Sequence, residues 1–199
     1  MAAPAALRNL RIILWGMVMA IGIGATWLFM PAALPQAAEL GRGSYRLATT
    51  KGADFTEASL KGQPSLVFFG FTHCPDVCPM TLSAIAGWQD ELGPSAEGMK
   101  VWFVTVDPAR DTPEVLAEYL AWLPGAIGVT GSEEELDKAR KAFGIMTDKV
   151  PLEGDNYAMD HSARVLLFDH EGRFRDHIGY LDPPEQVIVR LQDLLGLPG

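Results

Sequence analysis

A short apolar run that ends at a pair of cysteines constrains the fold of this chain more than any other feature. The run SLVFFGF, residues 65–71, is too short for a helix of its own and rich in aromatic side chains, which indicates a strand buried on both faces. Pro79 is predicted to be the first residue of the following helix, because a proline there leaves no hydrogen bond unmade. Cys74 and Cys78, the only cysteines of the chain, therefore fall in the predicted strand-to-helix turn, with both thiols expected to face outward.

The strand–helix pattern occurs again after the cysteines. Residues 100–107, KVWFVTVD, predict a second strand, and the helix after it is expected to begin with Asp111 as its N-cap and Glu114 three residues on. A further helix is predicted over GSEEELDKARKAFG, with Ser132 as its cap and Gly144 as its end. The order strand–helix–strand–helix implies a parallel sheet.

The last third of the chain has a different layout. Residues 163–179, ARVLLFDHEGRFRDHIG, predict two strands around a turn at 169–172, and PPEQVIVRLQDLL predicts a final helix. Together the elements predict an α/β thioredoxin-like fold, with a central mixed sheet flanked by helices. Ligand sites of open α/β sheets lie beyond the carboxyl ends of the strands. The cysteines are expected there, at a helix N-terminus whose dipole favours thiolate over thiol.

The N-terminal region predicts a membrane anchor. Residues 12–30 form a charge-free apolar run of 19 residues, close to the roughly 20 that a helix needs to cross a bilayer. Arg8 and Arg11 precede it and the next basic residue is Arg42, so the positive-inside rule places residues 1–11 in the cytoplasm. The run exceeds the apolar core of a signal peptide and no A-x-A pattern follows, which favours one uncleaved transmembrane helix over a cleaved signal.

The remainder predicts a linker and one domain. Residues 31–44 are rich in Ala, Pro and Gly, as a tether would be, and residues 45–199 have the length of a single globular domain. The part of the chain after residue 38 carries 14 basic and 25 acidic residues, a net charge of -11. Because such a domain repels phosphate backbones, no nucleic-acid binding is expected.

The cysteine pair has three candidate roles. A disulfide is ordinary in an exported domain, but one that closes only three residues would stabilise the fold little. Structural zinc and iron–sulfur clusters need four protein ligands, whereas two thiolates with one imidazole suit copper. Thiol–disulfide exchange stays open, although the spacing is one residue longer than C-x-x-C and Ala163 stands where thioredoxin-type sites carry proline.

Four histidines are available as a further ligand. His73 is expected to point away from the neighbouring cysteine, while His170 in a turn and His177 between charged residues are expected to be solvated. His161 lies two residues before a predicted strand. If that strand runs antiparallel to the first apolar strand, His161 reaches the same end of the sheet as the cysteines. The residues alone leave open whether it is a ligand or a loop histidine.

Three motifs together resemble a known family. FGFTHCPDVCP, VTVDPARDTPE and DHS before a strand, behind a single N-terminal anchor, are similar to the Sco/SenC family of copper-binding assembly factors for cytochrome c oxidase, over about residues 45–195. The resemblance implies a thioredoxin-like fold. It also implies that Cys74, Cys78 and His161 are the ligands of copper, as Cu(I) or Cu(II).

The resemblance also implies supporting residues. Asp160 is similar to an acidic family residue that supports the site, and Asp76 lies inside the cysteine loop. Asp107 and Asp111 match further family acids; the expected capping position of Asp111 favours a structural role for that residue.

The resemblance further implies a function and a location. The chain would be a metallochaperone rather than an enzyme, and would deliver copper to the binuclear copper site of cytochrome c oxidase subunit II. A second periplasmic copper chaperone would be its donor. The alternative is a thiol–disulfide reductase that keeps the cysteines of that partner reduced, with Cys74 attacking first. The chain would sit in the bacterial inner membrane as a single-pass protein with its domain in the periplasm.

Overall fold

The computed structural model describes residues 9, 14–17, 39–152, 154 and 156–197. The chain divides into two compact units, residues 1–35 and 36–199. In the first unit, residues 14–17 are helical. The predicted cytoplasmic N-terminus, anchor and linker lie largely outside the described residues. Among the residues that are described, no helix is both long and apolar enough to span a membrane, and the anchor stays a prediction.

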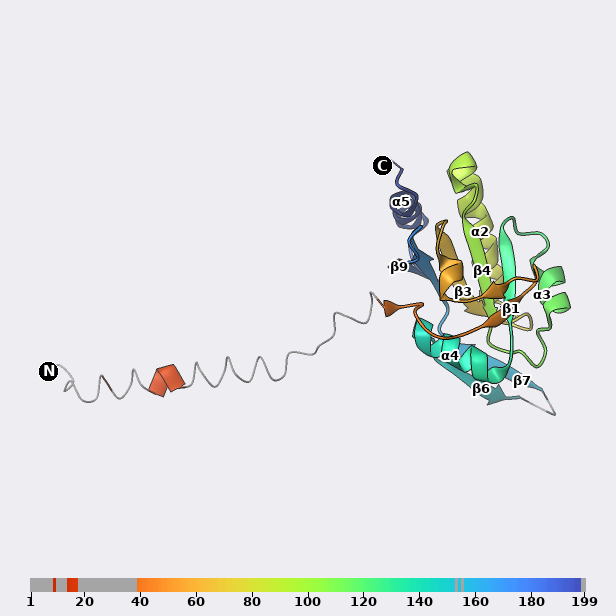
Figure 1. The fold of residues 1–199 in the computed structure, drawn as a ribbon, viewed down its shortest axis with the longest axis horizontal. Coiled ribbons are helices and arrows are strands. Elements are labelled where there is room, and N and C mark those ends of the chain that lie inside the picture. The colour runs from red at the N-terminus through yellow and green to blue at the C-terminus, as the bar shows by residue number, and fades with distance from the viewer. Residues whose placement is uncertain (1–8, 10–13, 18–38, 153, 155, 198–199) are drawn as a thin grey trace. The chain divides into compact units, whose positions relative to one another are not determined.

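The second unit is built on a seven-stranded mixed sheet (Figure 1) with the strand order β2-β1-β5-β4-β3-β8-β9. The three central strands are parallel to one another, and the outer pairs are antiparallel. A separate two-stranded sheet joins β6 and β7. The strands are β1 (Leu47–Thr49), β2 (Asp54–Phe55), β3 (Ser65–Gly70), β4 (Lys100–Thr105), β5 (Ala126–Thr130), β6 (Thr147–Pro151), β7 (Tyr157–His161), β8 (Arg164–Phe168) and β9 (Phe174–Gly179).

Helices flank this sheet. Figure 1 shows α2 and α5 beside each other, and the two helices are in contact. The helices are α2 (Val77–Leu92), α3 (Pro113–Leu120), α4 (Glu133–Phe143) and α5 (Pro184–Leu195), with short 3-10 turns η2 (Glu57–Leu60) and η3 (Gly93–Ala96). This arrangement confirms the predicted mixed α/β sheet of thioredoxin-like layout.

Strand β3 forms the centre of the core. All six of its residues are buried, with α4 packed on one face and the first turn of α2 on the other. On one face Phe69 packs against Phe143 of α4, with 5.3 Å between ring centroids. On the other face Phe68 packs against Phe103 of β4. The apolar run therefore forms the doubly buried strand that its composition predicts.

Several predicted element ends are also present. In α4 the Ser132 side chain accepts a hydrogen bond from the Glu135 N–H at 3.3 Å, and Gly144 ends the helix with a left-handed φ of 64°. Glycine adopts this left-handed conformation with less steric strain than any other residue, which explains why the helix ends at Gly144. The β8–β9 hairpin and α5 lie where they were expected. β8 pairs antiparallel with β3, the orientation that brings His161 to the same end of the sheet as the cysteines.

Two helix starts differ from the prediction. α2 begins at Val77, so Pro79 is its third residue; the first turn tolerates a proline because its N–H groups have no partner within the helix. In α3 the cap is Thr112, whose side chain accepts from the Val115 N–H. Asp111 is not the cap, and its side chain is fully buried.

Candidate metal centre

The cysteine loop joins the end of β3 to the start of α2. Cys74 lies in the loop and is partly exposed, whereas Cys78 lies in the first turn of α2 and is completely buried. The expectation that both thiols face outward is therefore wrong for Cys78. The Cys78 N–H donates to the Cys74 Sγ at 3.4 Å, and both cysteines are free thiols.

A glycine makes room for the buried thiol. A Cβ at Gly70 would lie 3.0 Å from the Cys78 Sγ and 2.8 Å from the Phe103 ring. Both distances are shorter than normal carbon contacts, so a larger residue would displace one of these side chains. The last residue of β3 therefore lets the first turn of α2 approach the sheet closely enough to bury a sulfur.

His161, 83 residues after Cys78 in the chain, lies next to this thiol. It is the last residue of β7 rather than a loop residue, and its Nε2 lies 3.7 Å from the Cys78 Sγ. The Nδ1 lies 3.3 Å from the Ser162 carbonyl oxygen. We assign the proton to Nδ1, because only an N–H can donate to a carbonyl, which leaves the lone pair of Nε2 facing the sulfur.

Burial shifts the pKa values of both groups toward their neutral forms. Loss of hydration raises the pKa of the Cys78 thiol well above its ordinary value, and the nearby Cys74 and Asp111 add to this, against a backbone hydrogen bond at Phe71. Burial also lowers the pKa of His161, despite the Ser162 carbonyl and Asp160. At Cys78 this outweighs the helix N-terminus that was expected to favour thiolate. At neutral pH the metal-free site thus pairs a thiol with a neutral imidazole.

The sulfur and nitrogen donors are of the types that bind a soft metal, and the distance between two of them also suits such an ion. With bond lengths of about 2.3 Å to sulfur and 2.0 Å to nitrogen, two ligands at a tetrahedral angle lie roughly 3.5 Å apart. The 3.7 Å between Cys78 Sγ and His161 Nε2 is close to this separation. In the described part of the chain, no three Cys, His, Asp or Glu side chains are gathered closely enough to hold an ion as they stand. Cys74, whose Sγ lies at the Cys78 N–H, is the third donor, and a local rearrangement would have to bring the three donors together.

The predicted supporting acids lie in three different settings. Asp160 is exposed, next to His161 on β7, and alternation along a strand directs their side chains to opposite faces. Asp76 occupies the N-cap position of α2 without a capping hydrogen bond from its side chain. Asp107 is almost fully buried and accepts a hydrogen bond from the Tyr157 hydroxyl at 2.8 Å.

The other three histidines stand apart from the thiols, as expected. All are exposed. The His73 Nδ1 lies 3.1 Å from the Thr72 hydroxyl, and His170 and His177 each lie near an acidic neighbour.

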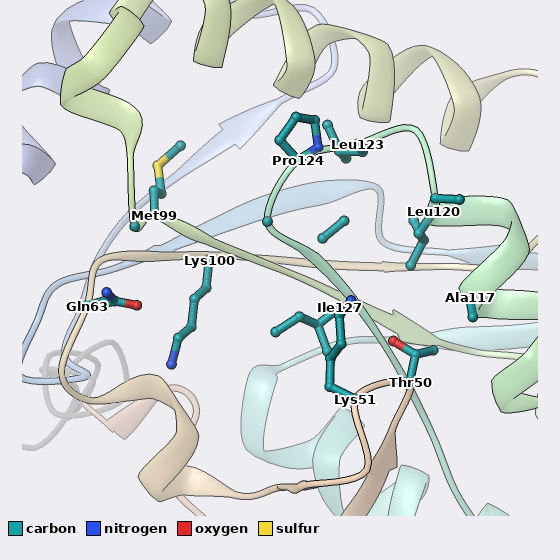
Figure 2. A pocket seen from close by; sticks show the side chains of 14 residues that line it. Thr50, Lys51, Gln63, Met99, Lys100, Ala117, Leu120, Leu123, Pro124 and Ile127 are labelled. Atoms are coloured by element: carbon teal, nitrogen blue, oxygen red, sulfur yellow. The ribbon is translucent and has the colours of Figure 1, made fainter.

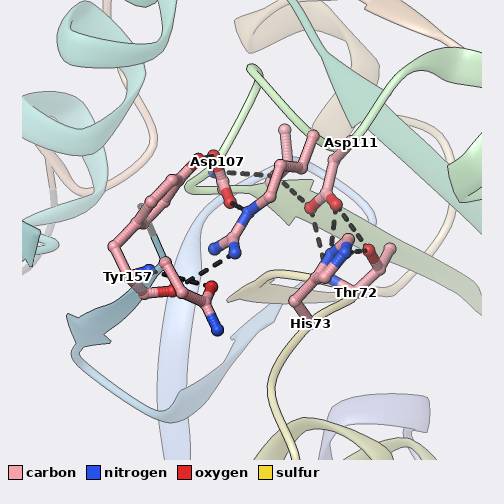
Figure 3. Close-up of polar contacts among 8 residues, drawn as sticks. Thr72, His73, Asp107, Asp111 and Tyr157 are labelled. Atoms are coloured by element: carbon pink, nitrogen blue, oxygen red, sulfur yellow. Dashed lines mark hydrogen bonds and ion pairs between the residues drawn. The ribbon is translucent and has the colours of Figure 1, made fainter. Parts of the chain in front are cut away.

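Asp111 has a role that sequence reasoning missed. It accepts a 2.6 Å hydrogen bond from each of two hydroxyls, those of Thr72 and Thr105, and a 3.2 Å bond from the Thr72 N–H (Figure 3). It thus ties the cysteine loop to β4. The pair Thr112–Pro113 carried the signal, since a threonine before a proline is a typical cap and first helical residue, which leaves Asp111 free for another role.

A cavity of about 520 Å³ lies at the opposite end of the parallel strands (Figure 2). Its lining includes Gln63, Lys100 and Ala126, at or just before the starts of β3, β4 and β5. No cysteine or histidine is among its described lining residues. Since ligands of open α/β sheets bind beyond the carboxyl ends of the strands, the cysteine loop is the better candidate site.

Comparison with known proteins agrees with this choice. The model of the family SCO1/SenC matches residues 33–196. The SCO2-like protein of Rickettsia prowazekii (strain Madrid E) is 34% identical over an alignment of 197 residues, which covers 92% of this chain and 96% of that protein.

Solved structures share the fold. ScoI of Bradyrhizobium japonicum, solved with copper bound, is 36% identical with a TM-score of 0.70, over 78% of this chain and 99% of that one. BsSco, a cytochrome c oxidase assembly protein of the Sco family with a disulfide switch, has a TM-score of 0.62 at 23% identity, over 81% of this chain and 96% of its own. The family match over residues 33–196 and the nearly full-length relative show that this chain belongs to the SCO1/SenC family.

Proposed function

We propose that this chain is a copper metallochaperone that holds the ion with Cys74, Cys78 and His161. The observation that carries the proposal is the 3.7 Å approach of the buried Cys78 Sγ to the Nε2 of the partly buried His161. Membership of a family with a copper-bound member supports the choice of metal. Two sulfurs satisfy Cu(I), and the imidazole completes a set that also suits Cu(II).

The two thiols differ in exposure, and this difference sets the order in which the copper–ligand bonds would be replaced during transfer to a partner. Cys78 is buried and His161 is partly buried, while Cys74 lies in the loop and is partly exposed. An incoming ligand of the partner therefore meets the Cys74–copper bond first. Replacement of that bond, followed by release from Cys78 and His161, passes the ion on without free copper in solution.

The family supports the proposed partner. The relative BsSco assembles cytochrome c oxidase, and we extend this to the binuclear copper site of subunit II, with a second periplasmic copper chaperone as donor. Residues 12–30 would anchor the chain in the bacterial inner membrane with its domain in the periplasm. Asp76 in the cysteine loop and Asp160 next to His161 in the sequence, both exposed, would support the site electrostatically.

A thiol–disulfide reductase is the second candidate, because both cysteines are free and the Cys74 Sγ lies at the Cys78 N–H. The more accessible Cys74 thiolate would attack a disulfide of the partner and form a mixed disulfide. Attack by Cys78 would then release the partner as a dithiol and leave Cys74–Cys78 oxidised. The disulfide switch of BsSco supports this candidate.

The variant His161→Ala separates the two functions, because both use the cysteines and only copper binding uses the imidazole. In the purified full chain, Cu(II) affinity measured by competition titration should fall by at least about tenfold, while the reduction potential of the cysteine pair stays near that of the wild type. His73→Ala, which removes an exposed histidine of the same loop next to Cys74, is the matched control and should change neither. Equal Cu(II) affinity in wild type and His161→Ala would refute the three-ligand site.

A further inference from the structure

The hairpin that carries His161 has no ladder to the main sheet. Within the described residues, β6 and β7 pair only with each other, whereas the other seven strands form one continuous sheet. Backbone pairing therefore sets the shape of this hairpin but not its place on the domain. Ser162 and Ala163 connect His161 to β8 of the main sheet, and the side chains of the hairpin add the contacts that hold His161 at the cysteine loop.

One face of β7 makes these contacts. Side chains two residues apart in a strand point the same way, so Tyr157, Met159 and His161 share a face. All three are partly buried, and Asp160 between the last two is exposed. Met159 packs against the hydrophobic core. Tyr157 lies at the other end of this face from His161, where it meets polar residues of the β4–α3 loop.

Tyr157 is held there by two residues that also hold each other (Figure 3). Its hydroxyl donates to Asp107 at 2.8 Å, and its backbone carbonyl accepts from the Arg110 Nη1 at 3.2 Å. The Arg110 guanidinium carbon lies 3.7 Å from the centroid of the Tyr157 ring, a cation–π contact. Arg110 Nε also forms an ion pair with Asp107, and both side chains are largely buried. The three residues thus make a closed set of contacts between the β4–α3 loop and β7.

Arg110 reaches the cysteine loop as well. Its guanidinium lies 5.9 Å from the centroid of the Phe71 ring, and Phe71 stands edge-on to the His161 ring at 6.0 Å. The contacts run from Tyr157 through Arg110 and Phe71 to His161. Three segments that are distant in the sequence therefore meet at one guanidinium.

We propose that Asp107, Arg110 and Tyr157 form a clamp that positions His161 against Cys78. The inference rests on the proposed function, since it concerns the placement of a proposed copper ligand. The clamp residues touch no metal; they act through the hairpin, as outer contacts of a ligand do. Because Cu(I) is satisfied by two sulfurs and Cu(II) gains from the imidazole, the clamp sets the preference of the site between the two oxidation states.

The variant Tyr157→Phe tests the clamp with the smallest change. It removes the hydroxyl that bonds to Asp107 and keeps the ring that Arg110 covers. We expect the Cu(II) affinity of the full chain to fall about tenfold, the lower range for loss of a contact behind a metal ligand, and the Cu(I) affinity to stay unchanged. Tyr45→Phe is the matched control. It also removes a buried hydroxyl, which donates to the Gly41 carbonyl at 2.7 Å, without a contact to the hairpin, and should change neither affinity.

Two further measurements separate positioning from general damage. In a His161→Ala background, Tyr157→Phe should have no additional effect on Cu(II) affinity, because the group it positions is gone. In the metal-free protein, amide hydrogen exchange over residues 157–161 should be faster in Tyr157→Phe than in the wild type, while exchange in β3 and β4 stays the same.

The outcomes distinguish failure of the clamp from failure of the proposed function. If His161→Ala weakens Cu(II) binding and Tyr157→Phe does not, the clamp is wrong and the copper site stands. Equal loss of Cu(I) and Cu(II) affinity in Tyr157→Phe, or faster exchange throughout the domain, would show a general structural role and overturn the clamp. A His161→Ala protein that binds Cu(II) as tightly as the wild type would overturn both.

Discussion

Gly70→Ala tests whether the close approach of α2 to the sheet holds the buried thiol in place. The added methyl group would lie 2.8 Å from the Phe103 ring and 3.0 Å from the Cys78 Sγ, so at least one of these buried groups must move. Overpacking of this kind costs about 1–3 kcal/mol. Alanine in a strand recovers about 0.5–1 kcal/mol relative to glycine, through a smaller loss of chain entropy. Gly70 has no positive φ, so no backbone strain is added.

The difference between the two ranges is a loss of about 0–2.5 kcal/mol in the free energy of unfolding, with its centre at about 1 kcal/mol. For a domain of this size a loss of about 1 kcal/mol corresponds to a fall of roughly 2–4 °C in Tm. The measurement is thermal and denaturant unfolding of the reduced, metal-free chain, followed by circular dichroism. Gly87→Ala is the matched control, because Gly87 is exposed within α2 with nothing within 4 Å of the added methyl group. That variant should be more stable than the wild type by up to about 1 kcal/mol.

Opposite signs for the same substitution at the two glycines are the expected result. A Gly70→Ala protein as stable as the wild type would refute the argument, since it would mean that α2 can move away from β3 at little cost. If copper binding weakens together with stability, the Cys78 side chain is the group that moves; if stability alone falls, it is Phe103.

Two further predictions concern protons. Because burial raises the pKa of the Cys78 thiol, copper has to displace its proton, so binding should release protons into a weakly buffered indicator solution and weaken as pH falls; no release would argue against thiolate ligation. Asp169 is buried, which opposes ionisation, but hydrogen bonds from the N–H and side chain of Arg173 and the N–H of Glu171 lower its pKa overall. A lowered pKa stabilises the fold above the unfolded value of about 3.9, and this contribution disappears as pH falls through the folded value. Asp169→Asn should therefore cost about 1–2 kcal/mol at pH 7 and progressively less below about pH 4, as measured by urea unfolding across pH; a cost independent of pH would contradict the assignment.

Much of the fold follows from signals between near neighbours in the chain. β3 has no polar residue between Leu66 and Gly70, so burial on both faces is its most stable setting. α4 has a Ser132 cap and a glycine at its end, and both act within one turn of the helix. These elements are predictable because the groups that stabilise them lie close together in the sequence.

Other elements depend on partners that lie far away. β2 has two residues and β1 three, too few for any periodicity, and they become strands only because β5 supplies an edge for β1. Asp111 illustrates the same limit for a single side chain. Two candidate caps stand side by side in the sequence, and the hydroxyls of Thr72 and Thr105 decide which of them is drawn into the core.

The sequence by itself determined which chemical groups are available: two thiols close together in the chain, a histidine before a strand, and a set of motifs that resembles one family. Only the tertiary structure decided how these groups meet. Cys78 and His161 are 83 residues apart, and they come together because β8 runs antiparallel to β3 and β7, which ends at His161, leads directly into β8. The thiol that was expected at the surface is buried, since its hydration depends on Gly70 and the strand behind it. Burial and pKa are properties of surroundings that distant residues supply, which is why no local pattern could predict them.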